Sequence, residues 1–167
     1  SFSMIKAQNT TPDQDKFLYI FVTIQKSMTE QLLKPSVSVR SVIFGPSDDI
    51  LILQRNSDND WELPGGRLSS YEGVSEGLRR EIHEETSLSI EIKDILLANS
   101  WINDRNNDRL GVYYVSDTEQ KRVRLSKEHS DFMWVSSSEA AYKLSTAQAK
   151  AVQLSREEVA TKPVLDI

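Results

Sequence analysis

Three glutamates that share one face of a predicted helix constrain this chain more than any other feature of its sequence. Glu81, Glu84 and Glu85 stand at positions i, i+3 and i+4, so a helix through this segment brings their carboxylates together. Like charges at that spacing repel by about 0.2–0.5 kcal/mol per pair, which a bound cation would offset. Oxygen ligands of this kind suit a hard divalent cation such as Mg²⁺. The alternative is a solvated acidic face, with Arg79 or Arg80 in weak surface pairs.

A proline and two glycines lie shortly before this helix. Pro64, Gly65 and Gly66 form a segment in which the backbone can approach a ligand closely, because glycine has no side chain. The N-terminus of the helix that follows favours an anion such as a phosphate. Ordinary turns use the same residues, so this segment indicates a site only in combination with the carboxylates.

Hydrophobic patterns and turn residues predict a mixed β-sheet with helices packed on it. The predicted strands span residues 37–44, 50–54, 90–98, 110–115, 122–125 and 132–135. Three helices are predicted: one over residues 72–85, one that begins at about residue 136, and one from residue 145 to about 154. Residues 61–67 are predicted to form a loop.

The N-terminal region carries a separate helical pattern. Thr11 and Pro12 give a helix start, and apolar residues recur at helical spacing until Pro35 ends the pattern. We therefore expect a helix over residues 11–35, preceded by a disordered or cloning-derived tail at residues 1–10. The helix either packs on the core or supplies the contact of a homodimer. The apolar stripe consists of Phe17, Phe21, Ile24, Met28 and Leu32.

The spacing around the glutamates resembles the Nudix box, the signature of a family of hydrolases. The resemblance covers roughly residues 36–155, and Trp61–Gly66 and Glu128–Val135 resemble the segments that flank the box in that family. Ser87 stands where the box has glycine, just after the helix, where a left-handed backbone is common. The matching box positions are Gly66, Glu72, Arg80, Glu81, Glu84 and Glu85.

The resemblance implies a fold and an activity. The fold is an α/β structure of the α+β sandwich type, the Nudix fold, with a mixed β-sheet between helices. Residues 36–160 would form the hydrolase domain, and the N-terminal helix would be an addition to it. The implied activity is that of a pyrophosphohydrolase dependent on Mg²⁺ or Mn²⁺, which cleaves a nucleoside diphosphate linked to another moiety, such as a nucleoside triphosphate or a nucleotide sugar.

The resemblance also implies roles for individual residues. Arg80 would orient a carboxylate and pair with Glu72, although a purely structural salt bridge is the alternative. The general base would be a box glutamate or Glu128, from the later loop. Metal binding is thereby assigned to Glu81, Glu84, Glu85 and the Gly66 carbonyl, and catalysis to Glu81, Glu84, Arg80 and Glu128.

Four further residues are candidates for contact with substrate. Arg55, like Arg105, could bind terminal phosphates, Arg67 is a candidate for substrate contact without a more specific role, and Trp61 and Trp101 could stack on a base. Solvated surface is the alternative for the arginines, and core packing is the alternative for the tryptophans.

Two other functions remain open at this stage. The first is a catalytically weak ligand-binding or regulatory module with the same fold, although such modules usually lose box carboxylates, and here all are present. The second is an isopentenyl-diphosphate isomerase, which needs an active-site cysteine, and this chain has no cysteine. Which diphosphate is the substrate stays open as well.

The charge balance limits the partners. There are 25 acidic and 20 basic residues, a net charge of −5, which argues against a nucleic acid polymer as ligand. Much of the acidic excess lies in the glutamates of residues 72–85, where bound cations would invert the local charge and attract a small diphosphate. The longest apolar run, residues 17–24, is too short to cross a membrane, and no signal-peptide pattern opens the chain. We therefore expect a cytoplasmic protein with no membrane partner.

Overall fold

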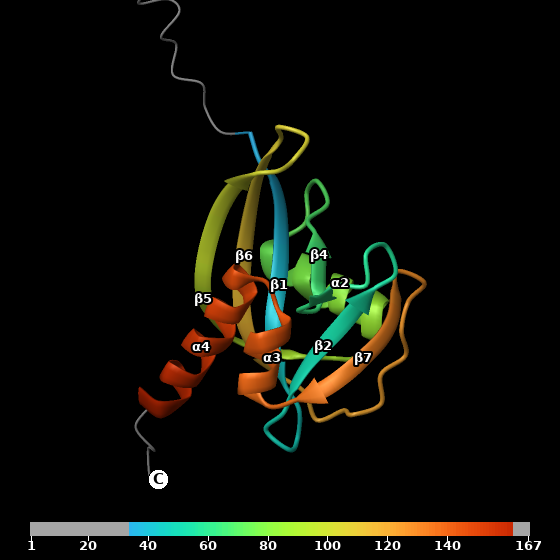
Figure 1. Cartoon of the computed structure of the whole chain (residues 1–167), viewed down its shortest axis with the longest axis vertical. Coiled ribbons are helices and arrows are strands. Elements are labelled where there is room, and N and C mark those ends of the chain that lie inside the picture. The colour runs from blue at the N-terminus through green and yellow to red at the C-terminus, as the bar shows by residue number, and fades with distance from the viewer. Residues whose placement is uncertain (1–33, 162–167) are drawn as a thin grey trace, which may run out of the picture. The chain divides into compact units, whose positions relative to one another are not determined.

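The computed structural model describes residues 34–161, with side chains through 157 (Figure 1). Seven strands form one mixed sheet in the order β3-β2-β1-β6-β5, with β4 paired to β1 and β7 paired to β2. The central pair, β1 and β6, is parallel. The strands are β1 (Ser36–Phe44), β2 (Ile50–Arg55), β3 (Trp61–Glu62), β4 (Gly65–Arg67), β5 (Glu91–Ile102), β6 (Asp108–Asp117) and β7 (His129–Val135).

Three described helices cover the two faces of the sheet. Helix α2 (Val74–Thr86) lies behind the sheet in Figure 1, and α3 (Ser137–Lys143) and α4 (Thr146–Thr161) lie in front of it. None of the described helices combines the length and the apolar character that a membrane span requires.

Alternation along β1 and β2 fills both faces with apolar side chains. Ile43 and Leu51 pack in the core under α2, whereas Val42 and Ile52 pack in the core under α3 and α4. A strand buried on both faces reads as a continuous apolar run, which is how β2 appears in the sequence. The predicted sandwich of a mixed sheet between helices is therefore confirmed.

Two local predictions were wrong. Residues 122–125 form no strand, because the N–H groups of Arg124 and Ser126 donate to carbonyl groups at the end of α2 rather than to a neighbouring strand. Residues 61–67 are not wholly a loop, because β3 pairs with β2 and β4 pairs with β1. Both predictions failed because the hydrogen-bond partners of these segments lie far away in the sequence.

The predicted helix over residues 11–35 lies outside the described residues except for its last two positions, and so does the tail at residues 1–10. The homodimer contact assigned to that helix stays a prediction.

Helix α2 ends in the left-handed turn that the glycine of the box would favour. Ser87 has a φ of 60° and a ψ of 17°, and its N–H donates to the carbonyl of His83. A residue with a Cβ pays about 1–2 kcal/mol for this conformation. The chain therefore keeps the turn of the motif with a residue that strains it.

We expect Ser87→Gly to stabilise the protein by about 1 kcal/mol, because glycine adopts the left-handed conformation without steric cost. Urea denaturation of the variant and the parent chain measures this difference. Ser89→Gly is the control, because Ser89 does not have a positive φ, and it should not stabilise the fold. A lower unfolding midpoint for Ser87→Gly would contradict the account of the turn.

Candidate active site

Helix α2 and strand β4 both contribute to the lining of one cavity of about 410 Å³, here called the carboxylate cavity. Glu81 and Glu85 of α2 line it, whereas Glu84 does not, and the side chain of Glu84 is 59% exposed. The structure thus brings together six of the residues predicted from the sequence and leaves Arg80, Glu84, Trp61 and Trp101 outside the lining of this cavity. The lining residues are Arg40, Arg55, Glu62, Gly65, Gly66, Arg67, Glu81, Glu85 and Glu128.

Gly66 is needed because the Glu81 carboxylate occupies the space beside it. A Cβ on Gly66 would overlap this carboxylate. Pairing of β4 with β1 fixes the position, since Gly66 lies opposite Val39 in the sheet. The backbone of β4 and the carboxylate of Glu81 therefore lie close together at this cavity.

Arg80 holds the carboxylates of the helix in place. Its guanidinium lies 2.7 and 2.9 Å from the two carboxylate oxygens of Glu72, 2.9 Å from Glu81 and 3.3 Å from Glu84. The hydrogen bond from Arg80, helped by the N–H of Ser69, lowers the pKa of Glu72 to about 2. The same pairing raises the pKa of Arg80. The pairing of Glu72 with Arg80 is therefore observed, and Arg80 also fixes Glu81.

Glu85 is a buried acid with little compensation. It is 6% exposed, and the N–H of Gly65 donates to its Oε2 at 2.9 Å. Burial raises the pKa of this carboxyl to about 7, despite that hydrogen bond. Ionising it in this place is costly unless a positive charge comes close. A divalent cation between Glu85 and Glu81 would supply that charge, and the oxygen donors available there fit Mg²⁺.

A second buried acid, Glu62, lies beside Glu85 but is fully paired. Arg40 lies 2.8 Å from it, Arg55 lies 3.3 Å from it, and Nε2 of His129 lies 3.0 Å from it. Burial alone would raise the pKa of Glu62, but His129 and the two arginines outweigh burial and lower it.

Glu62, Glu85 and His129 place ligand atoms within 4.8 Å of one another and form the one such cluster among the described residues. Because Arg40 and Arg55 already neutralise Glu62, we interpret this cluster as a hydrogen-bonded network at the edge of the site.

Sequence reasoning missed three members of this network: Arg40, Glu62 and His129. Arg40 interrupts the apolar pattern of β1, and a charged residue in a central strand is a signal that was available. Glu62 lies two residues before the predicted proline-glycine segment. His129 gave no usable signal, because its partner Glu62 is 67 residues away in the sequence.

The remaining candidates for substrate contact fall in different places. Arg55 and Arg67 line the carboxylate cavity. Trp61 is partly buried against the core under α3 and α4, with Lys143 Nζ 5.5 Å from its ring centre. Trp101 is 41% exposed and lines a neighbouring cavity of about 460 Å³, which shares Arg40 and Arg55 with the carboxylate cavity.

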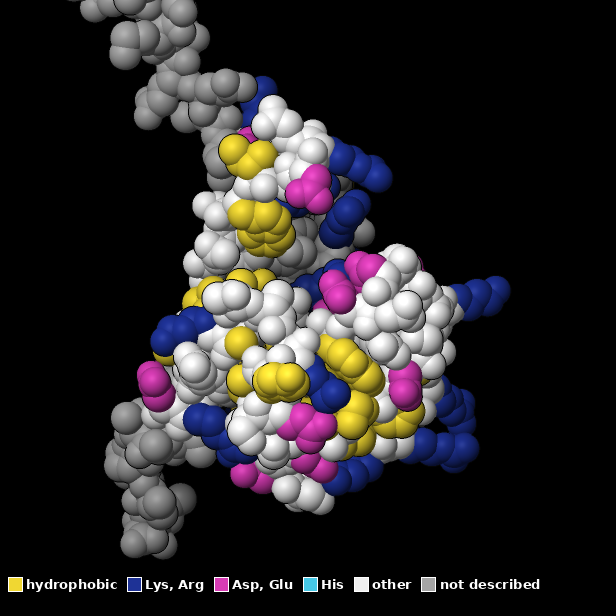
Figure 2. Space-filling model, in the orientation of Figure 1, with side chains coloured by type: hydrophobic (Ala, Val, Ile, Leu, Met, Phe, Trp, Pro, Cys, Tyr) yellow, Lys and Arg dark blue, Asp and Glu magenta, His cyan; other side chains and the backbone are white. Residues whose placement is uncertain are grey.

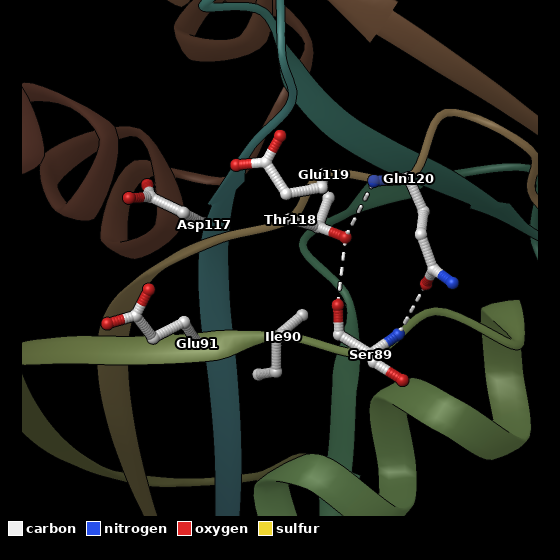
Figure 3. A pocket seen from close by; sticks show the side chains of 7 residues that line it. All are labelled: Ser89, Ile90, Glu91, Asp117, Thr118, Glu119 and Gln120. Carbon is white, nitrogen blue, oxygen red and sulfur yellow. Dashed lines mark hydrogen bonds between the residues drawn. The ribbon is translucent and has the colours of Figure 1, made fainter.

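Another cavity, of about 350 Å³, shares no residue with the carboxylate cavity (Figure 3). Two of its polar side chains are satisfied locally: Oγ1 of Thr118 donates to the carbonyl of Ser89 and accepts from the N–H of Gln120, and Oε1 of Gln120 accepts from the N–H of Ser89. Its acids Glu91 and Asp117 pair with Lys93. The carboxylate cavity is therefore the candidate active site.

Comparison with known proteins places the chain among hydrolases that act on diphosphate bonds. The model of the NUDIX domain matches residues 34–155, and the chain belongs to the Nudix family. The predicted family and the prediction of an enzyme acting on phosphoanhydride bonds are thereby confirmed. Members of this family generally use divalent metal ions and act on small nucleotides.

Known proteins resemble the chain at low to moderate identity. A MutT-like protein of Streptomyces ambofaciens is 37% identical over 60 residues, which cover 36% of this chain and 39% of that protein. The nucleoside triphosphatase NudI of Escherichia coli is 27% identical over 105 residues, 56% of this chain and 74% of that protein. The crystal structure of the MutT protein from Methanosarcina mazei Go1 is 28% identical, with a TM-score of 0.61, over 77% of this chain and 99% of that one.

Gly66→Ala should reduce turnover of a diphosphate substrate by at least about tenfold without unfolding the protein, because the added Cβ displaces the Glu81 carboxylate rather than backbone. Steady-state kinetics with circular dichroism as the folding check measures both effects. The matched control is Gly73→Ala, whose Cβ would meet its nearest described neighbour, a Glu76 carboxylate oxygen, at 3.3 Å. Equal activities for the two variants would refute the close fit at Gly66.

Stability of the metal-free protein should depend on pH through Glu85. The pKa of Glu85 is about 7 in the folded state, above its ordinary value of 4.5. Between these two pH values the folded state binds more protons than the unfolded state. The free energy of unfolding therefore falls as pH rises from 5 to 8. In EDTA at pH 8, Glu85→Gln should be more stable than the parent by up to about 3 kcal/mol, and the gain should vanish below pH 5.

Urea denaturation at several pH values tests this dependence, with the exposed Glu84→Gln as control. A gain for Glu85→Gln that is the same at pH 5 and pH 8 would show that burial does not raise this pKa.

Proposed function

We propose that the chain is a pyrophosphohydrolase dependent on Mg²⁺ or Mn²⁺ that cleaves a nucleoside diphosphate linked to another moiety. The observation that carries this proposal is the composition of the carboxylate cavity, where Glu81 and the uncompensated Glu85 share one cavity with three arginines. Carboxylates on one side suit a cation, and guanidinium groups on the other suit phosphate oxygens. The likeness to NudI, a nucleoside triphosphatase, supports a nucleotide as substrate.

Glu81, Glu85 and the carbonyl of Gly66 would hold the metal ion. Their donors are oxygens, and the protein itself only partly compensates the charge of the buried Glu85. Glu84 pairs with Arg80 at 3.3 Å and would join the site from its edge. A divalent cation bound there would polarise the phosphate and lower the pKa of an attacking water.

The side chains around the metal ligands would orient the substrate and move the proton. Arg40, Arg55 and Arg67 would bind the diphosphate oxygens. Arg80 would act as a positioning residue, because it holds Glu81. Glu128 is our candidate for the general base, since it lines the cavity, is exposed, and forms no ion pair with any described residue. Glu81 is the alternative base.

The two competing functions have less support. A regulatory module without activity would not need the uncompensated Glu85 beside Glu81. An isopentenyl-diphosphate isomerase would need a cysteine, and the chain has none.

Substituting either proposed ligand should abolish hydrolysis that depends on a divalent cation. Replacing a residue that only hydrogen bonds to a metal ligand typically lowers metal affinity or activity by about 10–100-fold. Glu81→Gln and Glu85→Gln change the proposed ligands themselves, so each should lower the rate of hydrolysis by at least about 100-fold. Phosphate release from nucleoside triphosphates and nucleotide sugars, with Mg²⁺ or with EDTA, measures the loss.

Glu91→Gln is the control, because Glu91 belongs to the separate cavity of Figure 3 and should retain full activity. Full activity of either ligand variant, or equal turnover in EDTA, would refute the proposed site.

A further inference from the structure

The cavity beside Trp101, here called the Trp101 cavity, differs in charge from the rest of the protein. None of the described residues that line it is acidic, although the chain has an excess of acids. Arg40 and Arg55 lie at its boundary with the carboxylate cavity. Figure 2 shows hydrophobic, basic and acidic side chains next to one another on the face of the molecule that carries α3 and α4. A ligand in the Trp101 cavity could therefore reach the carboxylates through the two arginines.

Gln148 presents a hydrogen-bond donor of fixed orientation to this cavity. Its side chain belongs to α4 and the residue is 8% exposed. The backbone N–H of Leu63 donates to Oε1 of Gln148, so the amide cannot flip without placing two donors against each other. The Nε2 group is then left for the cavity, and it has no partner among the described residues.

The first turn of α4 adds to the donor character. Thr146, Ala147 and Gln148 line the cavity, and the first N–H groups of a helix have no partner within the helix. They also carry the partial positive charge of the helix N-terminus. The first turn of α4 thus adds hydrogen-bond donors next to Gln148.

Trp101 supplies a flat wall. A Cβ on Gly111 would lie 3.1 Å from the indole of Trp101, so the ring lies close to the backbone of β6, where glycine avoids a tight contact. A flat, partly exposed indole is a surface on which another planar ring stacks.

We infer that the Trp101 cavity selects planar rings that carry carbonyl oxygens, with Gln148 as the specificity-determining residue. This inference rests on the proposed function. The bases guanine, hypoxanthine, uracil and thymine present a carbonyl where adenine and cytosine present an amino group. A ring stacked on Trp101 accepts a hydrogen bond from Gln148 Nε2 through that carbonyl, whereas an amino group there leaves two donors facing each other.

Nucleoside monophosphates test the inference independently of hydrolysis, because they contain no diphosphate bond. The full chain is titrated in EDTA with two matched pairs, IMP against AMP and UMP against CMP, by isothermal calorimetry. The members of each pair differ in one carbonyl or amino group. We expect IMP and UMP to bind at least about tenfold more tightly than AMP and CMP.

Gln148→Glu keeps the acceptor for the Leu63 N–H but replaces the Nε2 donor with an acceptor, so it should abolish the preference. Trp101→Ala should weaken the tighter ligand of each pair while keeping the order. Equal affinities within each pair for the parent chain, no binding of any of the four, or an unchanged preference in Gln148→Glu would each overturn the inference.

The two proposals fail separately. Metal-dependent hydrolysis without a base preference overturns only this inference, and a base preference without hydrolysis overturns only the proposed function.

Discussion

The buried carboxylate of Glu85 is the constraint on which the rest of the site depends. Helix α2 brings it under the backbone of β4, where the Gly65 N–H is its close hydrogen-bond donor. That hydrogen bond does not offset the cost of burial. Burial therefore makes the carboxylate costly to ionise and raises the pKa of Glu85 to about 7. The candidate site therefore lacks enough positive charge beside Glu85, and a bound divalent cation would supply it.

Two neighbouring acids illustrate how surroundings separate roles. Glu62 and Glu85 are equally buried, but Glu62 has two arginines and a histidine, whereas Glu85 has none of them within 3.5 Å. The paired acid has a lowered pKa and fixes Arg40 and Arg55 between the two cavities. Glu85, which has less compensation than Glu62, has a raised pKa and is left for a ligand. Glu62 thus serves to hold the structure together, whereas Glu85, a residue of the same type, is available for function.

Local patterns in the sequence predicted what depends on local geometry. Helical spacing placed Glu81 and Glu85 on one face of α2, and the turn at Ser87 was expected from its place after the helix. Strands β3 and β4 were missed because each is short and depends on pairing with a distant strand. His129 and Gln148 were missed for the same reason, since nothing near them in the sequence reveals their buried partners, whereas Arg40 was missed although its charge in a central strand was an available signal.

The central claim is that Glu81, Glu85 and the Gly66 carbonyl together bind one divalent cation. Anomalous diffraction from crystals of the full chain grown with Mn²⁺ tests it most directly, because the signal locates the metal without assumption about activity. The account predicts a peak in the carboxylate cavity within coordination distance of Glu81 and Glu85, with Glu62 still paired to Arg40. A peak between Glu62 and His129, or no peak in this cavity at saturating Mn²⁺, would contradict it.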